Sequence, residues 1–158
     1  MNAELKKVAD HLQNSIDLIP AKFLKYSEEE LRRKPAPNKW SKKEILGHLI
    51  DSAANNHHRF VKSQFEGNPY FVNSYAQDNW VKSQKPNEIN SKFLVEFWKM
   101  YNMHLHWIMV NYPEEKLAVK CKAEDVTELK ENILLLMKIT ILNSQIRILK
   151  KFWVPRDI

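Results

Sequence analysis

Hydrophobic positions follow helical spacing along four long stretches of the chain: 2–19, 41–65, 87–111 and 125–152. In each stretch apolar side chains recur every three or four residues, with polar side chains between them. This spacing gathers the apolar residues on one face of an α-helix. The pattern predicts four long amphipathic helices with short extra helices in the connections, and it favours an all-α four-helix bundle.

Local signals mark several of the expected helix ends. Ser27–Glu30 and Ser41–Glu44 match the capping box, in which a serine and a glutamate three residues later bond reciprocally to backbone N–H groups. Asp125–Glu128 is a similar match and is expected to open the fourth helix. Pro20 is expected to end the first helix.

The spacing also predicts which faces of two helices point inward. In the second helix the shared face is Ile45, Leu49, Ala53, Asn56 and Phe60. In the third helix the expected inner face is Ile89, Phe93, Phe97, Met100, His104, Leu105 and Ile108.

The connection from Tyr70 to Pro86 is long for a bundle and rich in aromatic residues. Such loops are usually functional or disordered, and the aromatic content argues against disorder. It is expected to carry a short helix near 77–81, and both a structural plug and a lid over a ligand pocket fit its composition. This connection is long enough to span the bundle, so consecutive helices need not run in alternating up and down directions. The segment 117–123 is expected to be an extended linker, too short to found a sheet.

Composition narrows the class of protein. The 158 residues suit one domain over 1–158. Two glycines argue against glycine-rich phosphate loops, and the single Cys121 excludes an internal disulfide. No apolar run approaches the roughly 20 residues of a membrane span, and no signal-peptide pattern is present, so a cytoplasmic protein without a membrane partner is expected. The net charge of +6 is scattered along the chain, and no nucleic-acid partner is expected.

The histidines offer the clearest candidate chemistry, and it is limited. His48 lies at the edge of the apolar face of the second helix, with Asp51 three residues later. His57 and His58 are neighbours in sequence and do not face one site together. No His-x-x-x-His or Cys-x-x-Cys pair occurs. The residues alone therefore predict a helical bundle with a pocket near His48 and no metal site.

Two motifs add a resemblance. The stretch from Lys39 to Asp51 (KWSKKEILGHLID) resembles the Trp-Ser…Gly-His-Leu-x-Asp signature of the DinB-like superfamily. The stretch from Tyr75 to Trp80 (YAQDNW) is similar to that family's element before the third helix, and Trp98 and Asn102 resemble its third-helix pattern. The branch most similar includes the YfiT-type hydrolases and bacillithiol transferases. The resemblance implies a four-helix bundle in up-down-down-up order.

The resemblance also implies a metal site that this sequence does not preserve. In active relatives three histidines bind a divalent metal, commonly zinc or nickel, and one of them stands at the position of His48. The other two form a His-x-x-x-His pair on the fourth helix, where this chain has Lys138 and Leu142. No histidine follows His106. The expectation is a degenerate metal site without a cofactor, unless replacement ligands hold a divalent ion.

Two hypotheses for function follow. In the first, the protein is metal-free and keeps a pocket for an unknown small molecule or partner. The residues expected to line it are His48, Asp51, Ser52, Asn55, Trp80, His104, Lys138 and Leu142. Lys138 is expected to pair with Asp51. In the second, the protein is a thiol transferase or hydrolase, with His48 as general base or with His104 or Asp51 as replacement ligands. A homodimer is expected from the broad apolar arc of the fourth helix.

Overall fold

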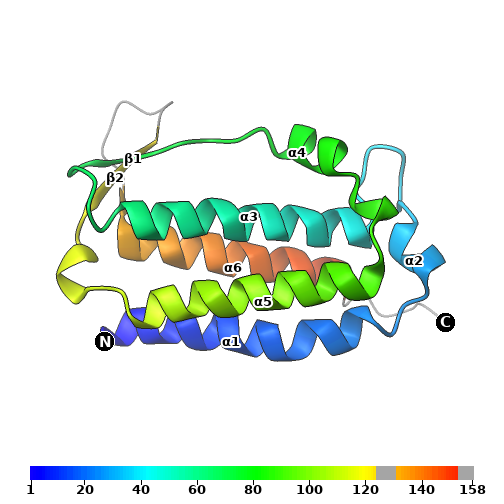
Figure 1. Cartoon of the computed structure of the whole chain (residues 1–158), viewed down its shortest axis with the longest axis horizontal. Helices are drawn as coiled ribbons and strands as arrows, with labels where there is room; N and C mark the ends of the chain where they lie inside the picture. The colour runs from blue at the N-terminus through cyan, green and yellow to red at the C-terminus, as the bar shows by residue number, and fades with distance from the viewer. Residues whose placement is uncertain (124–130, 153–158) are drawn as a thin grey trace.

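Four long helices form a bundle in the structure, a computed structural model that describes residues 1–123 and 131–152. They are α1 (Ala3–Phe23), α3 (Lys42–Lys62), α5 (Ser91–Val110) and α6 (Ile133–Phe152). Figure 1 shows α1 and α6 running in one direction and α3 and α5 in the other. The all-α class, the four-helix bundle and the up-down-down-up order are therefore confirmed.

The connection between α3 and α5 makes this order feasible. It contains β1 (Tyr70–Val72), the short helix α4 (Gln77–Gln84) and the 3-10 turn η1 (Pro86–Glu88). Figure 1 shows it running back along α3, so that α5 begins at the end of the bundle where α3 begins. The helix predicted near 77–81 is confirmed as α4.

A small sheet corrects one expectation. The segment predicted to be an extended linker contains β2 (Lys120–Ala123), which follows the 3-10 turn η2 (Glu114–Lys116). β2 pairs in parallel with β1, with Tyr70 opposite Cys121, and antiparallel with β3 (Glu131–Asn132). The prediction was wrong because one partner of β2, the strand β1, lies about 50 residues away in sequence, in a different connection.

Both serine capping boxes are present. The Ser41 hydroxyl accepts the Glu44 N–H at 3.1 Å, and Glu44 accepts the Ser41 N–H at 2.7 Å. The box at Ser27 opens α2 (Glu28–Arg32) in the same way. The third box, 125–128, lies outside the described residues, and α6 begins later than predicted, at Ile133.

Pro20 does not end α1, contrary to the prediction. The helix continues to Phe23, and the Leu24 N–H still bonds to the Pro20 carbonyl at 3.0 Å. Proline removes one hydrogen bond close to the helix end. The added turn buries Phe23 completely, and we infer that this burial outweighs the lost bond.

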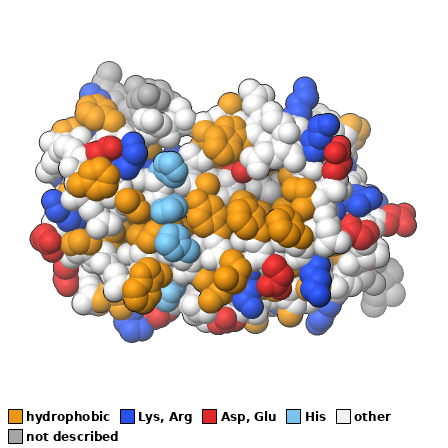
Figure 2. All heavy atoms as spheres, in the orientation of Figure 1, with side chains coloured by type: hydrophobic (Ala, Val, Ile, Leu, Met, Phe, Trp, Pro, Cys, Tyr) orange, Lys and Arg blue, Asp and Glu red, His pale blue; other side chains and the backbone are white. Residues whose placement is uncertain are grey.

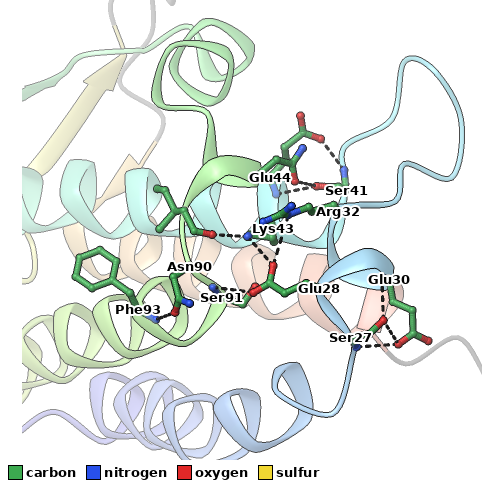
Figure 3. Close-up of polar contacts among 12 residues, drawn as sticks. Ser27, Glu28, Glu30, Arg32, Ser41, Lys43, Glu44, Asn90, Ser91 and Phe93 are labelled. Atoms are coloured by element: carbon green, nitrogen blue, oxygen red, sulfur yellow. Dashed lines mark hydrogen bonds and ion pairs between the residues drawn. The ribbon is translucent and has the colours of Figure 1, made fainter.

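A buried lysine joins three helices at the end where α3 and α5 begin (Figure 3). Lys43 is 0% exposed, and its ammonium lies 3.0 Å from a Glu28 carboxylate oxygen. The Lys43 ammonium also donates to the Ile89 carbonyl, and the Ser91 N–H donates to Glu28 at 3.2 Å. Hydrogen bonds from Ser91 and Lys43 lower the pKa of Glu28 to about 2. This network fixes the starts of α3 and α5 relative to α2.

The inner face predicted for α5 was largely wrong. Of the residues expected on it, Leu105 is buried and Ile89 and Ile108 pack against the core, whereas Phe93 is 62% exposed and Met100 is 61% exposed. The residues that α5 does bury are Ser91, Leu94, Val95, Trp98, Asn102, Leu105 and Met109. Nearly every turn of α5 carries apolar residues on both sides, so spacing alone selects the wrong face.

Among the described residues, no helix combines the length and the apolar character that a bilayer crossing requires.

Candidate functional site

One face of α3 carries the polar residues of the candidate site. His48, Ser52 and Arg59 lie four and seven residues apart, and this spacing aligns their side chains along the helix. The adjacent face of α3 carries its buried apolar residues, which hold the helix in the bundle. α3 therefore presents a polar row while its apolar face anchors it.

A cleft of about 250 Å³ opens over this row. Its walls come from three elements: α3, the 74–77 segment that precedes and begins α4, and α6. The lining residues are His48, Ser52, Arg59, Ser74, Tyr75, Gln77, Thr140 and Asn143. The lining is predominantly polar, which suits a polar ligand.

A second cleft of about 300 Å³ adjoins the first at Arg59. It includes Asn55 and Trp80, two residues predicted for the site. The predicted set is therefore divided: His48 and Ser52 line one cleft, and Asn55 and Trp80 line the other. Arg59 borders both.

Aromatic rings surround His48, which is 3% exposed. The Trp40 ring centre lies 4.9 Å from the imidazole centre, and the Tyr75 ring stacks at 6.5 Å. Tyr75 also contacts Trp80, at 5.3 Å between ring centres. Tyr75 thus places the 70–86 connection as a roof over the cleft beside His48, whereas Trp80 lines the second cleft.

Asp51 and Lys138 do not pair. The Lys138 ammonium lies 2.6 Å from a Glu4 carboxylate oxygen, and Asp51 accepts a hydrogen bond from Gln84 at 2.6 Å. Burial raises the pKa of Asp51, with the Gln84 hydrogen bond as the opposing cause. The predicted pairing was wrong because Lys138 has a carboxylate partner on α1. Leu142 is 38% exposed and lies outside both clefts.

His104 lies on another part of the surface. Its ring centre is 4.9 Å from that of His57, and His57 contacts His58 at 6.0 Å. Burial, together with the charges of His104 and His58, lowers the pKa of His57. Figure 2 shows histidines gathered on the face that α5 presents, between hydrophobic side chains. The structure does not bring His104 to the cleft at His48.

Arg59 is the main residue that sequence reasoning missed. Its guanidinium donates to the Asn73 carbonyl at 2.9 Å and to the Asn56 side-chain oxygen at 3.2 Å. Burial lowers its pKa, but a guanidinium stays charged at neutral pH. Its position was detectable, because it continues the helical spacing of His48, Ser52 and Asn55. Thr140 and Asn143 gave no comparable signal, since their role depends on how α6 packs.

The residues at the cleft do not fit the divalent metal that the resemblance implies. His48 is the only histidine in its lining, and α6 contributes a hydroxyl and an amide from Thr140 and Asn143. Zinc sites normally use three or four imidazole, thiolate or carboxylate ligands. Across the described part of the chain, no group of three or more such residues is arranged to hold a metal ion.

Comparisons with known proteins identify the fold. No family model and no curated protein matches the sequence. Among solved structures, YfiT from Bacillus subtilis, described as a probable metal-dependent hydrolase with an unusual four-helix bundle topology, superposes with a TM-score of 0.78. The match is 16% identical and covers 94% of this chain and 85% of YfiT. The chain has the DinB/YfiT-like fold.

A second structure has the same fold. The mycothiol-dependent maleylpyruvate isomerase matches with a TM-score of 0.69 and 10% identity, over 93% of this chain and 62% of that protein. The resemblance read from the two motifs is therefore confirmed at the level of the DinB/YfiT-like fold. At these identities the likeness establishes architecture, and the activities belong to those proteins.

Proposed function

We propose that this protein binds a small polar molecule in the cleft at His48 without a metal ion. The observation that carries the proposal is the lining itself: a polar cleft of about 250 Å³ with one histidine and no metal-binding donor set among the described residues. Three separate elements build the cleft, which suits a specific binding site.

The side chains that line the cleft would contribute to ligand binding in different ways. Hydroxyl and amide groups of Ser52, Thr140 and Asn143 offer neutral hydrogen bonds from two helices. The rings of Tyr75 and Trp40 lie against His48, which lines the cleft but is only 3% exposed. Because Arg59 also holds the Asn73 carbonyl, the connection that roofs the cleft is tied to α3.

Metal content tests the proposal most directly. The protein is purified without an affinity tag, incubated with zinc, nickel or manganese, dialysed and analysed by mass spectrometry. We expect no stoichiometric ion. One ion per chain in the wild type that disappears in His48→Ala would overturn the proposal and favour the thiol transferase or hydrolase alternative.

Ligand screening by thermal shift tests the cleft itself. Compounds that raise the melting temperature of the wild type are expected to lose this effect in Ser52→Phe, in which a large side chain fills the cleft. Ser83→Phe, at an exposed position on α4 outside the cleft, is the matched control. Equal responses in both variants would place the ligand elsewhere.

We also propose a homodimer, formed through α5 and not through α6, the helix on which the sequence-based expectation rested. Five apolar side chains on it, Phe93, Phe97, Met100, Met103 and Trp107, are each 45–64% exposed. Their exposed fractions add up to nearly three whole side chains. At roughly 200 Å² for each side chain, this is about 560 Å² of exposed apolar surface per chain. A pair of chains would bury about 1,100 Å², close to the lower limit of stable interfaces. Sedimentation is expected to show a dimer that Phe97→Glu dissociates; an unchanged Phe97→Glu dimer would contradict this interface.

A further inference from the structure

Arg59 carries more hydrogen-bonding capacity than the protein uses. A guanidinium has five N–H donors in a fixed planar arrangement. Arg59 donates one hydrogen bond to the Asn73 carbonyl and one to the Asn56 side-chain oxygen. Both acceptors are neutral, so they orient the group without balancing its charge.

The charge of Arg59 has no carboxylate partner among the described residues. Two acidic groups beside the clefts have partners of their own: Glu66 pairs with Lys62 at 3.0 Å, and Asp51 bonds to Gln84. Burial is the first cause of the lowered pKa of Arg59, so the guanidinium loses part of its hydration. A partly buried charge normally has a counter-charge, because removing it from water is costly.

The position of Arg59 indicates where an anionic ligand would bind. The residue borders both clefts, and the hydroxyl groups of Ser52 and Ser74 in the first are neutral donors that also suit an anion. His58, Lys62 and Glu66 line the second cleft, where the charges of Lys62 and Glu66 are paired and cancel. An anionic group in the first cleft would thus meet a cation and hydroxyl donors.

We propose that the ligand of this cleft carries an anionic group, a carboxylate or a phosphate, which binds the Arg59 guanidinium. This inference rests on the proposed function, because it specifies the ligand of the same cleft. Carboxylates and phosphates share the two-oxygen edge that matches the guanidinium fork, and such paired bonds are among the strongest hydrogen bonds in proteins.

Small matched probes test the inference. Wild-type protein is titrated with benzoate, phenyl phosphate and neutral benzamide at constant ionic strength, and binding is followed through the NMR signal of the Arg59 Nε–H group and by calorimetry. We expect at least one anion to bind and to shift the Arg59 signal. Binding of benzamide is expected to be about ten- to a hundredfold weaker, the usual range for losing hydrogen bonds to a charged group. The anion that binds more tightly tells whether the site takes carboxylates or phosphates.

Variants locate the binding. Arg59→Gln is expected to weaken anion binding about ten- to a hundredfold, and Arg59→Lys, which keeps the charge without the planar fork, is expected to weaken it less. Arg33→Gln removes the same charge from an exposed position beyond α2 and is expected to change nothing. The NMR titration of the wild type stands even if Arg59→Gln fails to fold.

Three results would overturn the inference: no anion binding to the wild type, equal affinity for benzoate and benzamide, or anion binding that Arg59→Gln leaves unchanged. These results are separable from failure of the proposed function. If benzamide binds, depends on an open cleft through Ser52→Phe and ignores Arg59, the pocket stands and only the anionic ligand is wrong. A stoichiometric ion lost in His48→Ala removes the metal-free pocket instead.

Discussion

The two central helices α3 and α5 run parallel and pack side by side, yet their sequences reveal their orientation to very different degrees. On α3 the face predicted from spacing is the buried face, with Ile45, Leu49 and Phe60 each at most 3% exposed. On α5 the predicted face is largely exposed, with Phe93 and Met100 above 60%. Spacing identifies a buried face only when the opposite face is polar. α3 meets this condition and α5 does not.

The largest expected contrast comes from one phenylalanine on each helix. Phe60→Ala on α3 should lower the free energy of unfolding by about 3–5 kcal/mol, because Phe60 is completely buried. Phe93→Ala on α5 should cost less than about 0.5 kcal/mol in the monomer, because Phe93 is mostly exposed. Urea denaturation measures both. Equal costs would mean that α5 is rotated from its place here.

The second largest effect on stability is expected at the Lys43–Glu28 ion pair, which joins α3 to α2 and, through Ser91, to α5. Glu28→Gln should destabilise the fold by about 2–3 kcal/mol at pH 7, since it leaves Lys43 buried without its counter-charge. This is less than the ~3–5 kcal/mol of a fully buried pair, because Glu28 is half-exposed. Adding Lys43→Met should restore most of the loss, and a double-mutant cycle measures the coupling.

The pH dependence of this contact has a definite sign. The folded-state pKa of Glu28 is about 2, below its ordinary 4.5. Its contribution is therefore fully present above pH 4.5 and lost as the pH falls toward 2. The difference between the wild type and Glu28→Gln should shrink over that range. A constant difference would contradict the ionic role of Glu28.

A smaller effect is expected where the chain crosses α3 on its way to α5. A Cβ atom at Gly47 would lie 2.4 Å from Pro86 Cγ. Gly47→Ala should therefore lower stability by about 1–2 kcal/mol, despite the better helix propensity of alanine. Thermal unfolding tests this, and Pro86→Ala, which removes the Cγ atom but keeps the Cβ atom at 2.9 Å, should rescue part of the loss in Gly47→Ala. Without rescue, the close approach of η1 to α3 is not the cause.

The smallest expected effect is an increase in stability, from Asp51→Asn. Burial raises the folded-state pKa of Asp51 above its ordinary 3.8, so its ionisation weakens the fold as the pH rises through the folded-state value. Asp51→Asn removes that charge and can still accept from Gln84. It should stabilise the protein by about 0.5–1 kcal/mol at pH 7 and have less effect below pH 3.8. Destabilisation at pH 7 would reveal a cation paired with Asp51.

The sequence allowed the fold to be predicted further than the site. Capping boxes and helical spacing act over a few residues, so Ser41, Glu44 and the apolar row of α3 could be read directly. The pairing of β1 with β2 and the contact of Lys138 with Glu4 join distant segments, and no local pattern encodes them. Arg59 lies between these cases. Its alignment with His48 could be read from the sequence, but the absence of a carboxylate partner for it among the described residues emerges only from packing.

The parallel course of α3 and α5 also has an electrostatic consequence. Backbone dipoles give a helix a partial positive charge at its N-terminus, and antiparallel neighbours largely cancel one another. Here the starts of α3 and α5 lie at the same end of the bundle, where their positive ends add and the ammonium of Lys43 joins them. Glu28 places its carboxylate at this point, accepting from the first backbone N–H of α5 at Ser91. Two parallel central helices thus favour an anion where they begin, and α2 supplies it.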